Sequence, residues 1–398
     1  METISNRVNN LSSSATIAMN QKSRDLQAKG INVINLSVGE PDFFTPDHIK
    51  AAAKKAIDDN FSFYPPVAGY PDLKKAIAEK FKRENNLEYT TEQIIVSSGA
   101  KHSLANTMMS LINKGDEVII PAPYWVSYLE QVKLCEGIPV VISAGFDRNF
   151  KITSAQLEAA ISLKTKALLL CSPSNPTGAV YSRTELRALA DVLSKHPQIM
   201  VISDEIYEHI NFIGGHETIA QFADMKDRTV VINGVSKAYA MTGWRIGYMA
   251  APLWLTKACD KLQGQTTTGA TTIAQKAATA ALTGDQSCVA DMNGAFKRRK
   301  DMVVKLVREI PGLKVYDPDG AFYVFPQVSY SFGKSFNGNK IANSSDLCLY
   351  LLEHAHIATV PGDAFGDDQC IRISFATSDE KLVEAMKRMR EALAALKS

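Results

Sequence analysis

Short apolar runs rich in β-branched residues alternate with longer amphipathic stretches between residues 90 and 250. The amphipathic stretches at 102–113, 125–136 and 183–196 have the spacing of helices that bury one face. Strand-like runs that alternate with such helices predict a mostly parallel sheet covered on both faces. The last two runs are too close for a helical crossover, so we expect one edge of the sheet to be antiparallel. The expected strands are 93–97, 117–120, 140–143, 166–171, 200–203, 229–233 and 245–250.

The pattern changes in the last third of the chain. A long charged stretch at 286–310 and a final stretch from Ser378 have helical spacing, and short apolar runs lie between them. This mixture predicts a second, smaller α+β domain. The polar segment 336–345 is expected to be a surface loop, and the first dozen residues a polar arm. The short strands expected here are 313–315, 321–325, 356–360 and 370–375.

Composition and charge place the chain among ordinary globular proteins. It has 398 residues, of which 45% are hydrophobic and 22% charged, so two domains are expected. The formal net charge of +2 gives no electrostatic basis for binding nucleic acid, and no apolar run approaches membrane-spanning length. The 6 cysteines form no C-x-x-C pair, which argues against a disulfide framework or a zinc site and favours the cytoplasm.

Residues suited to ligand binding follow several expected strands. In open parallel sheets, ligands bind beyond the carboxyl ends of the strands. Gly99 and Ala100 follow the first strand and begin a helix, where backbone N–H groups attract an anion. Asn175 lies between two prolines after the fourth strand, and Asp204 follows the fifth, with Tyr207 three residues further on. Taken singly, these residues fit a helix start, a Pro-Gly turn and a helix cap.

Lys237 lies among small residues directly after the sixth expected strand, and Arg245 follows eight positions later. A lysine shielded from water loses its proton more readily and can form a Schiff base with a carbonyl. Alone, Ser236-Lys237 is ordinary loop sequence. Together with the strand-end residues it provides what pyridoxal phosphate needs: donors and a cation for the phosphate, an acid for the ring nitrogen, donors for the phenolic oxygen and an amine for the aldehyde. The chain contains no G-x-G-x-x-G or P-loop motif, so the nucleotide alternatives lose support.

These motifs resemble the class I aminotransferases of fold type I, most closely aspartate aminotransferases of the bacterial branch. The resemblance extends from Ser14 to Arg372. It implies an α/β large domain at 48–289 with a mostly parallel seven-stranded sheet, a small α+β domain built from 14–47 and 290–398, and an N-terminal arm at 1–13. The matching segments are 37–42, 64–66 with Gly69, 123–125, 175–178, 203–207, 236–237 and 242–245 with Gly247.

The resemblance also implies roles for individual residues. Lys237 would hold the cofactor covalently and move the proton at the substrate, and Asp204 would pair with the ring nitrogen. Trp125 would stack on the ring and contact the substrate, and Arg372 would bind the substrate α-carboxylate with help from the Gly39 backbone. Tyr64 would reach the phosphate of a neighbouring subunit, which predicts a homodimer with shared active sites. Asn175 and Tyr207 would donate to the phenolic oxygen, Asn175 would also contact the substrate, and the phosphate would be held by Gly99, Ala100, Ser236 and Arg245, next to Lys101.

The chain departs from another branch of this family in the loop 264–272, which contains no cation. In that branch, an arginine there binds the distal carboxylate of the substrate. If the substrate is a dicarboxylic acid, Lys101 is the expected partner, with Ser14 and Thr16 as neutral donors. Some relatives that accept prephenate carry a basic residue where Ser12 stands, so its absence weakens the prephenate alternative.

The expected activity is therefore transfer of an amino group between aspartate and 2-oxoglutarate in two half-reactions. The same chemistry on an aromatic amino acid, alanine or prephenate is an alternative. Elimination or cyclisation on the same cofactor is also open. A cofactor-binding regulator is less favoured, since the short polar arm leaves no room for a DNA-binding module.

Overall fold

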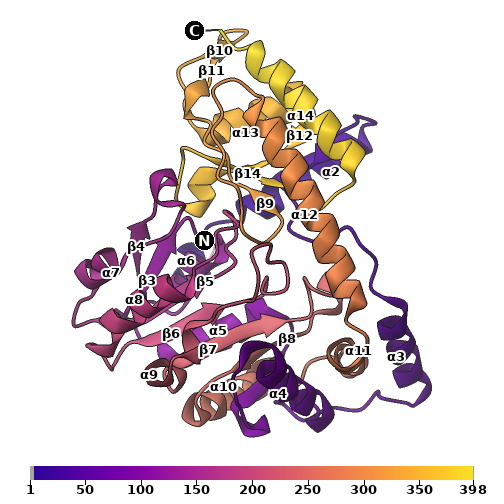
Figure 1. The fold of residues 1–398 in the computed structure, drawn as a ribbon, viewed down its shortest axis with the longest axis vertical. Coiled ribbons are helices and arrows are strands. Elements are labelled where there is room, and N and C mark those ends of the chain that lie inside the picture. The colour runs from indigo at the N-terminus through magenta and orange to yellow at the C-terminus, as the bar shows by residue number, and fades with distance from the viewer. Residues whose placement is uncertain (1–3, 398) are drawn as a thin grey trace.

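The computed structural model describes residues 4–397 and contains a seven-stranded sheet in the order β2-β8-β7-β6-β5-β3-β4 (Figure 1). β8 runs antiparallel to both neighbours, and every other pairing in this sheet is parallel. The mostly parallel seven-stranded sheet is thus confirmed. The strands are β2 (Ile94–Ser97), β3 (Glu117–Ala122), β4 (Ile138–Ser143), β5 (Thr165–Cys171), β6 (Met200–Asp204), β7 (Thr229–Gly234) and β8 (Gly247–Ala250).

The antiparallel strand is not where we expected it. β8 lies between β7 and β2, so the edge strand on this side is β2, which runs parallel to the body of the sheet. The short connection from β7 does place β8 beside it in the opposite direction. The pattern of apolar runs could not show that β2, far earlier in the chain, would pair with the free side of β8.

Helices cover both faces of the sheet (Figure 1). Ile95 of β2 packs with α5, α6 and α10, whereas its neighbours Ile94 and Val96 pack on the opposite side with α3, α4 and α11. This alternation is the two-residue period of a strand buried on both faces. α7, α8 and α9 cover the part of the sheet formed by β3, β5 and β6. The bounds are α3 (Asp47–Asp58), α4 (Pro71–Asn85), α5 (Ala100–Leu111), α6 (Ser127–Leu134), α7 (Ser154–Ala160), α8 (Arg183–Ser194), α9 (Ala223–Lys226), α10 (Leu253–Thr266) and α11 (Thr272–Thr283).

A further apolar cluster joins the two ends of the chain. Met19 of α2 and Ile34 of β1 pack with α12, α13 and α14 from the C-terminal part, and β1 pairs in parallel with β12. α12 runs from the sheet region into this cluster (Figure 1). The cluster supports a small domain built from both termini, although the exact boundaries at 47 and 290 stay predictions. Its elements are α2 (Ala15–Ala28), β1 (Ile34–Asn35), α12 (Ser287–Arg308), β9 (Tyr323–Val324), α13 (Ser344–His354), β12 (Ile357–Ala358), β13 (Val360–Pro361), β14 (Ile371–Ser374) and α14 (Asp379–Ala394).

In the terminal parts, the structure contradicts one predicted strand and adds short elements to the predicted loop and to the predicted arm. The run 313–315 forms no strand; Lys314 makes only an isolated bridge to Gln327. The expected loop 336–345 contains a two-residue hairpin, β10 (Ser335–Phe336) with β11 (Asn339–Lys340), followed by the start of α13. The described part of the expected arm contains the single-turn helix α1 (Asn6–Asn9), capped by Ser5. Such short elements depend on tertiary contacts and single caps, which produce no periodic signal.

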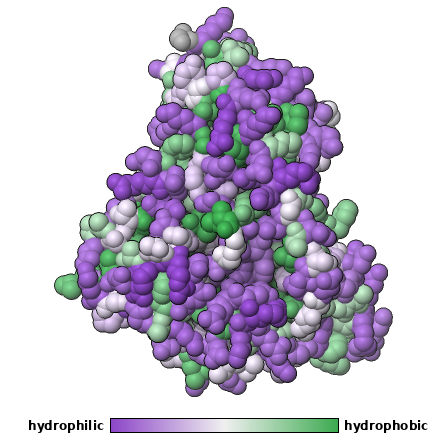
Figure 2. All heavy atoms as spheres, viewed as in Figure 1, coloured by the Kyte–Doolittle hydropathy of each residue, from purple (hydrophilic) through white to green (hydrophobic). Residues whose placement is uncertain are grey.

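Hydrophilic residues cover most of the face seen in Figure 2, and hydrophobic ones form small separate groups. Within residues 4–397, no helix is long and apolar enough to cross a membrane.

Candidate active site

A cavity of about 260 Å³ opens beyond the carboxyl ends of the central strands. It gathers residues from the strands β5, β6 and β14, from the helices α2, α5 and α6, and from the turn after β7. Most of the residues predicted for the site therefore meet in one place, although they are up to 358 positions apart in sequence. The predicted residues that line it are Ser14, Thr16, Gly39, Ala100, Lys101, Trp125, Asn175, Asp204, Tyr207, Ser236, Lys237, Arg245 and Arg372.

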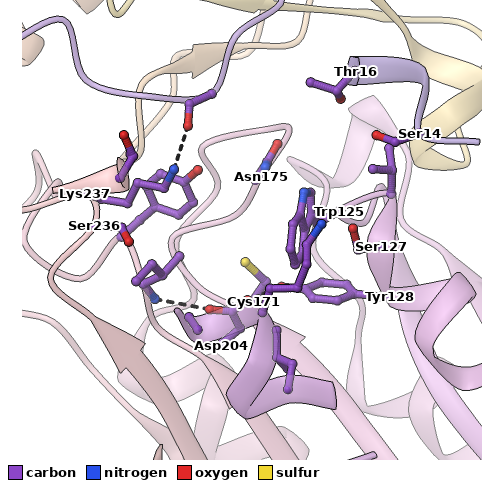
Figure 3. A pocket seen from close by; sticks show the side chains of 18 of the residues that line it. Ser14, Thr16, Trp125, Ser127, Tyr128, Cys171, Asn175, Asp204, Ser236 and Lys237 are labelled. Carbon is purple, nitrogen blue, oxygen red and sulfur yellow. Dashed lines mark hydrogen bonds between the residues drawn. The ribbon is translucent and has the colours of Figure 1, made fainter. Parts of the chain in front are cut away.

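Lys237 lies on one wall of the cavity (Figure 3). Its Nζ donates to the backbone carbonyl of Gly39 at 2.6 Å. Burial lowers the pKa of Lys237 to about 8, since the attraction of Glu40 does not outweigh it. The positive charges of Arg372 and Arg245 contribute to this lowered pKa. An amine that is partly neutral near pH 7 is a nucleophile and can accept a proton.

Asp204 is the last residue of β6 and is buried at the floor of the same cavity (Figure 3). Its carboxylate accepts from the Tyr128 hydroxyl at 2.7 Å and from the Ile206 N–H at 3.3 Å. No lysine or arginine within residues 4–397 forms an ion pair with it. Burial accordingly raises the pKa of Asp204 to about 6, despite these two donors. A buried acid that faces a cavity without a cationic partner favours a ligand that carries a proton or a positive charge.

An anion-binding corner lies where β2 meets α5. Gly99 is the N-cap of α5 with φ 88°, and the guanidinium of Arg245 lies against it. A Cβ on Gly99 would be 2.4 Å from a nitrogen of Arg245, so only glycine permits this approach. Ala100 begins the helix, and Ser236 lines the same cavity. Helix N–H groups, a hydroxyl and a guanidinium together suit a phosphate.

Arg372 is buried, with 1% of its surface exposed, and carries an unpaired positive charge. It donates to Asn175 Oδ1 at 2.9 Å and to the Ser37 carbonyl at 2.6 Å, and its Nε has no partner. No carboxylate of residues 4–397 lies within ion-pairing distance of it. The Tyr323 ring stacks at 4.5 Å from the guanidinium carbon and fixes its plane. The guanidinium of Arg372 is thus oriented and lacks a carboxylate partner, so it can bind the carboxylate of a ligand.

The opposite side of the cavity is more open. Lys101 is exposed in the first turn of α5, and its Nζ lies 4.8 Å above the Trp125 ring. In the part of the chain that the structure describes, Ser14 caps α2 without a side-chain hydrogen bond to the helix, and the Thr16 hydroxyl is buried without a hydrogen-bond partner. Figure 3 shows Ser14 and Thr16 across the pocket from Lys237. Unused donors near a cation fit a polar group on the distal end of a ligand.

Two predicted residues do not line the cavity. Gly99 contributes by its contact with Arg245 rather than by forming the wall. The Tyr64 side chain is 92% exposed and lies outside the cavity of its own chain. A role for Tyr64 in another subunit stays a prediction.

Three residues at or next to the cavity were not predicted from the sequence. Tyr128 follows Trp125 by one helical turn, and the two rings meet edge to face at 5.4 Å. Cys171 is the register partner of Asp204 and thus ends its strand at the same edge of the sheet. The rule used for Asp204 could have found Cys171. Tyr323, whose hydroxyl lies 2.8 Å from that of Tyr207, sits in an apolar run and carried no signal.

The chain is similar to known proteins over nearly its whole length. Residues 31–389 match the family Aminotransferase class I and II. The chain is 49% identical to a probable aspartate/prephenate aminotransferase of Rickettsia bellii over 100% of both chains. It is 50% identical to the aspartate/prephenate aminotransferase of Cereibacter sphaeroides over 96% of each chain. Among solved structures, it resembles the aspartate aminotransferase of Rhizobium meliloti with a TM-score of 0.96 and 44% identity over 100% of both chains. It also resembles that of Thermus thermophilus with maleate, with a TM-score of 0.93 and 39% identity over 98% of this chain and 100% of that one.

Proposed function

Because the chain belongs to the aminotransferase class I and II family, we propose that it uses pyridoxal phosphate to move the amino group between L-aspartate and 2-oxoglutarate. The observation that carries the proposal is the content of one cavity. A nucleophilic amine at Lys237, a buried acid at Asp204 and an unpaired guanidinium at Arg372 all face the same space.

The residues present fit pyridoxal phosphate. The raised pKa of Asp204 and its lack of a cationic partner match a protonated ring nitrogen, which would offer both a proton and a positive charge. The corner at Ala100, Ser236 and Arg245, with Gly99, would hold the phosphate. Lys237 would hold the aldehyde carbon. When bound, the cofactor supplies an electron sink for the pair of electrons left when the substrate Cα loses its proton.

Lys237 would act as the acid and base of the reaction. A pKa of about 8 lets its amine take the proton from the substrate Cα and return it at pH 7 to 8. The carbonyl of Gly39, which accepts from Nζ at 2.6 Å, orients this amine when it is free. Tyr207 and Asn175 would donate to the phenolic oxygen of the cofactor, and Trp125 would cover its ring face.

Arg372 would bind the carboxylate common to all amino-acid substrates. Asn175 and Ser37 already hold the guanidinium in place, so little reorganisation is needed on binding. At the other end, Lys101 would meet the distal carboxylate of aspartate, with Ser14 and Thr16 as neutral donors. The Thermus thermophilus neighbour solved with maleate, a four-carbon dicarboxylate, supports a dicarboxylic substrate.

Prephenate is the second candidate substrate, since relatives that span the whole chain are named aspartate/prephenate aminotransferases. Prephenate also carries two carboxylates, so Arg372 and Lys101 suit it by the same reasoning. Ser12, where a basic residue would favour prephenate, holds its N–H 2.8 Å from a Glu130 carboxylate oxygen. Aspartate remains the first assignment.

We also propose that the protein is a homodimer in the cytoplasm. Large apolar side chains are exposed in the segment 44–64: Phe44, Phe63 and Tyr64 are 92%, 81% and 92% exposed. A second copy that covers this surface would bring its Tyr64 toward the phosphate corner. All 6 cysteines are unpaired, which agrees with a reducing compartment.

The test is a reaction with purified protein loaded with pyridoxal phosphate. Aspartate and 2-oxoglutarate should give oxaloacetate and glutamate, and aspartate alone should bleach the visible absorbance of the bound cofactor. A panel with prephenate, phenylalanine and alanine ranks the alternatives. Product release without any oxo-acid acceptor would indicate a lyase, and no spectral change with any amino acid would contradict aminotransfer.

A further inference from the structure

The segment from Asp204 to Glu208 places some side chains on the cavity wall and buries others in the protein behind it. Asp204 and Tyr207 line the cavity, whereas Glu205 and Glu208 do not and are 1% and 5% exposed. Two carboxylates buried behind the active-site wall need partners, because an uncompensated buried charge is costly. The proposed function uses neither of them.

Glu205 is held by three donors from two segments. Its Oε1 accepts from the Ser203 hydroxyl at 2.7 Å and from the Thr218 hydroxyl. Its Oε2 lies 2.9 Å from His216 Nε2. Burial would lower the pKa of His216, but Glu205 outweighs burial and raises it, so this contact is charge-assisted. These bonds tie the residue after Asp204 to the loop before η3 (Ile219–Gln221).

Glu208 is held from the other side by α4. Lys80, which has 0% of its surface exposed, forms an ion pair with Glu208 Oε1. Asn85 donates to Glu208 Oε2 at 2.8 Å and accepts from Lys80 Nζ at 2.8 Å, which closes a three-membered network. Burial alone would raise the pKa of Glu208, but Lys80, His209 and His216 outweigh it and hold the pKa well below its ordinary value. The carboxylate is therefore ionised and fully engaged.

This cluster is not a metal site. Glu205, Glu208 and His216 do place one ligand atom each within 4.8 Å of one another. The ammonium of Lys80 already provides the positive charge there, and both carboxylates use their oxygens for hydrogen bonds. The two carboxylates therefore bind groups of the protein rather than a metal ion. Through these bonds they hold the backbone next to Asp204, the acid of the active site.

We propose that Glu205 and Glu208 are positioning residues that fix Asp204 and Tyr207 on the wall of the active-site cavity. Peptide units are planar, so anchoring residues 205 and 208 restricts the backbone of the residues directly before them. Outer partners of this kind orient groups that touch a ligand and strongly affect binding and rate. The inference rests on the proposed function, since it assigns Asp204 and Tyr207 to the cofactor.

Two matched variants test the role of Glu205. Glu205→Leu removes every acceptor, whereas Glu205→Gln keeps an acceptor for the two hydroxyls. We expect Glu205→Leu to raise the Kd of the apoprotein for pyridoxal phosphate about tenfold, as loss of outer partners does at metal sites. Its kcat should fall about 10²-fold, because small misplacements of reacting groups have that effect. The absorbance of the bound cofactor should also titrate at a shifted pH.

Controls separate positioning from general stability. Glu205→Gln should stay within about threefold of the parent protein in Kd, because it loses only part of a hydrogen-bond set. Lys300→Met removes a lysine from another partly buried ion pair, with Asp317 at 2.7 Å, and should lower Tm without changing Kd or the spectrum. If Glu205→Leu does not fold, Thr218→Val removes one hydroxyl donor and should raise Kd by a smaller factor.

The outcomes are distinct. A Glu205→Leu or Thr218→Val protein that loses Tm but keeps the parent Kd and spectrum would show a purely structural role and overturn the inference. A parent protein that does not bind pyridoxal phosphate would overturn the proposed function itself. For Glu208, Lys80→Met with Glu208→Leu should raise Kd, and Lys80→Met with Glu208→Gln should restore it through an amide pair with Asn85. These two double variants have the same net charge. Equal Kd values for them would show that Glu208 is not a positioning residue.

Discussion

The two ends of the active-site cavity are built differently. At one end Arg372 is 1% exposed, and two hydrogen bonds and an aromatic ring hold its guanidinium. At the other end Lys101 is exposed, its Nζ lies over the Trp125 ring, and it forms no salt bridge within residues 4–397. A group shared by all amino-acid substrates is thus met by a rigid, buried partner, and the group that differs among them by an exposed partner. A preoriented partner favours rate, and a less constrained one favours a range of substrates.

The largest expected effect is at the rigid end. Arg372→Met should lower kcat/KM about 10³-fold, because loss of one partner of a buried charge pair typically costs about 4 kcal/mol. The loss should be similar for aspartate and phenylalanine, since both carry the α-carboxylate. Steady-state kinetics with both substrates measures it. A loss confined to aspartate would reverse our assignment of the two ends.

At the exposed end, where Lys101 lies, the effect should depend on the substrate. Lys101→Ala should lower kcat/KM for aspartate roughly 10- to 100-fold, as expected for loss of a hydrogen bond to a charged group. The rate with phenylalanine should stay nearly unchanged. Lys75→Ala, which removes an exposed lysine of α4, is the matched control. An unchanged rate with aspartate would favour the aromatic or alanine alternative.

The neutral donors should contribute less. Thr16→Val removes a buried hydroxyl that has no hydrogen-bond partner among residues 4–397. If this hydroxyl binds the distal carboxylate, KM for aspartate should rise roughly 2- to 10-fold, and kcat should change little. Ser14→Ala should act in the same direction. A KM that rises equally for phenylalanine would show a general effect on α2 instead.

The smallest effect concerns pH. Burial raises the pKa of Asp204 from 3.8 to about 6, so its contribution to the stability of the apoprotein is present at low pH and is lost as pH rises through 6. A cationic ring nitrogen would offset that loss. The gain in Tm on adding pyridoxal phosphate should therefore be larger at pH 7 than at pH 5. Lys237, with its pKa lowered to about 8, carries a proton in most molecules of the apoprotein at both pH values.

Asp204→Asn is the control for this pH dependence. The amide does not titrate, so the difference in Tm gain between pH 5 and pH 7 should shrink. Thermal melting of apo and loaded protein at both pH values measures it. An equal difference in the two proteins would assign the pH dependence to another group.

The sequence predicted the buried strands better than it predicted contacts between distant segments. Buried strands and residues at their carboxyl ends, such as Asp204, follow from periodicity and from the rule for open sheets. The place of β8 inside the sheet depended on pairing with β2, which is distant in sequence. Tyr323 and the anchors of Glu205 come from contacts between separate segments, which leave no periodic trace.

The most direct test of the account is to find which residue binds the cofactor. Protein loaded with pyridoxal phosphate is reduced with borohydride, digested, and mapped by mass spectrometry. The account predicts one modified peptide, with the added mass on Lys237 and none on Lys101. Modification of another lysine, or of none, would contradict it.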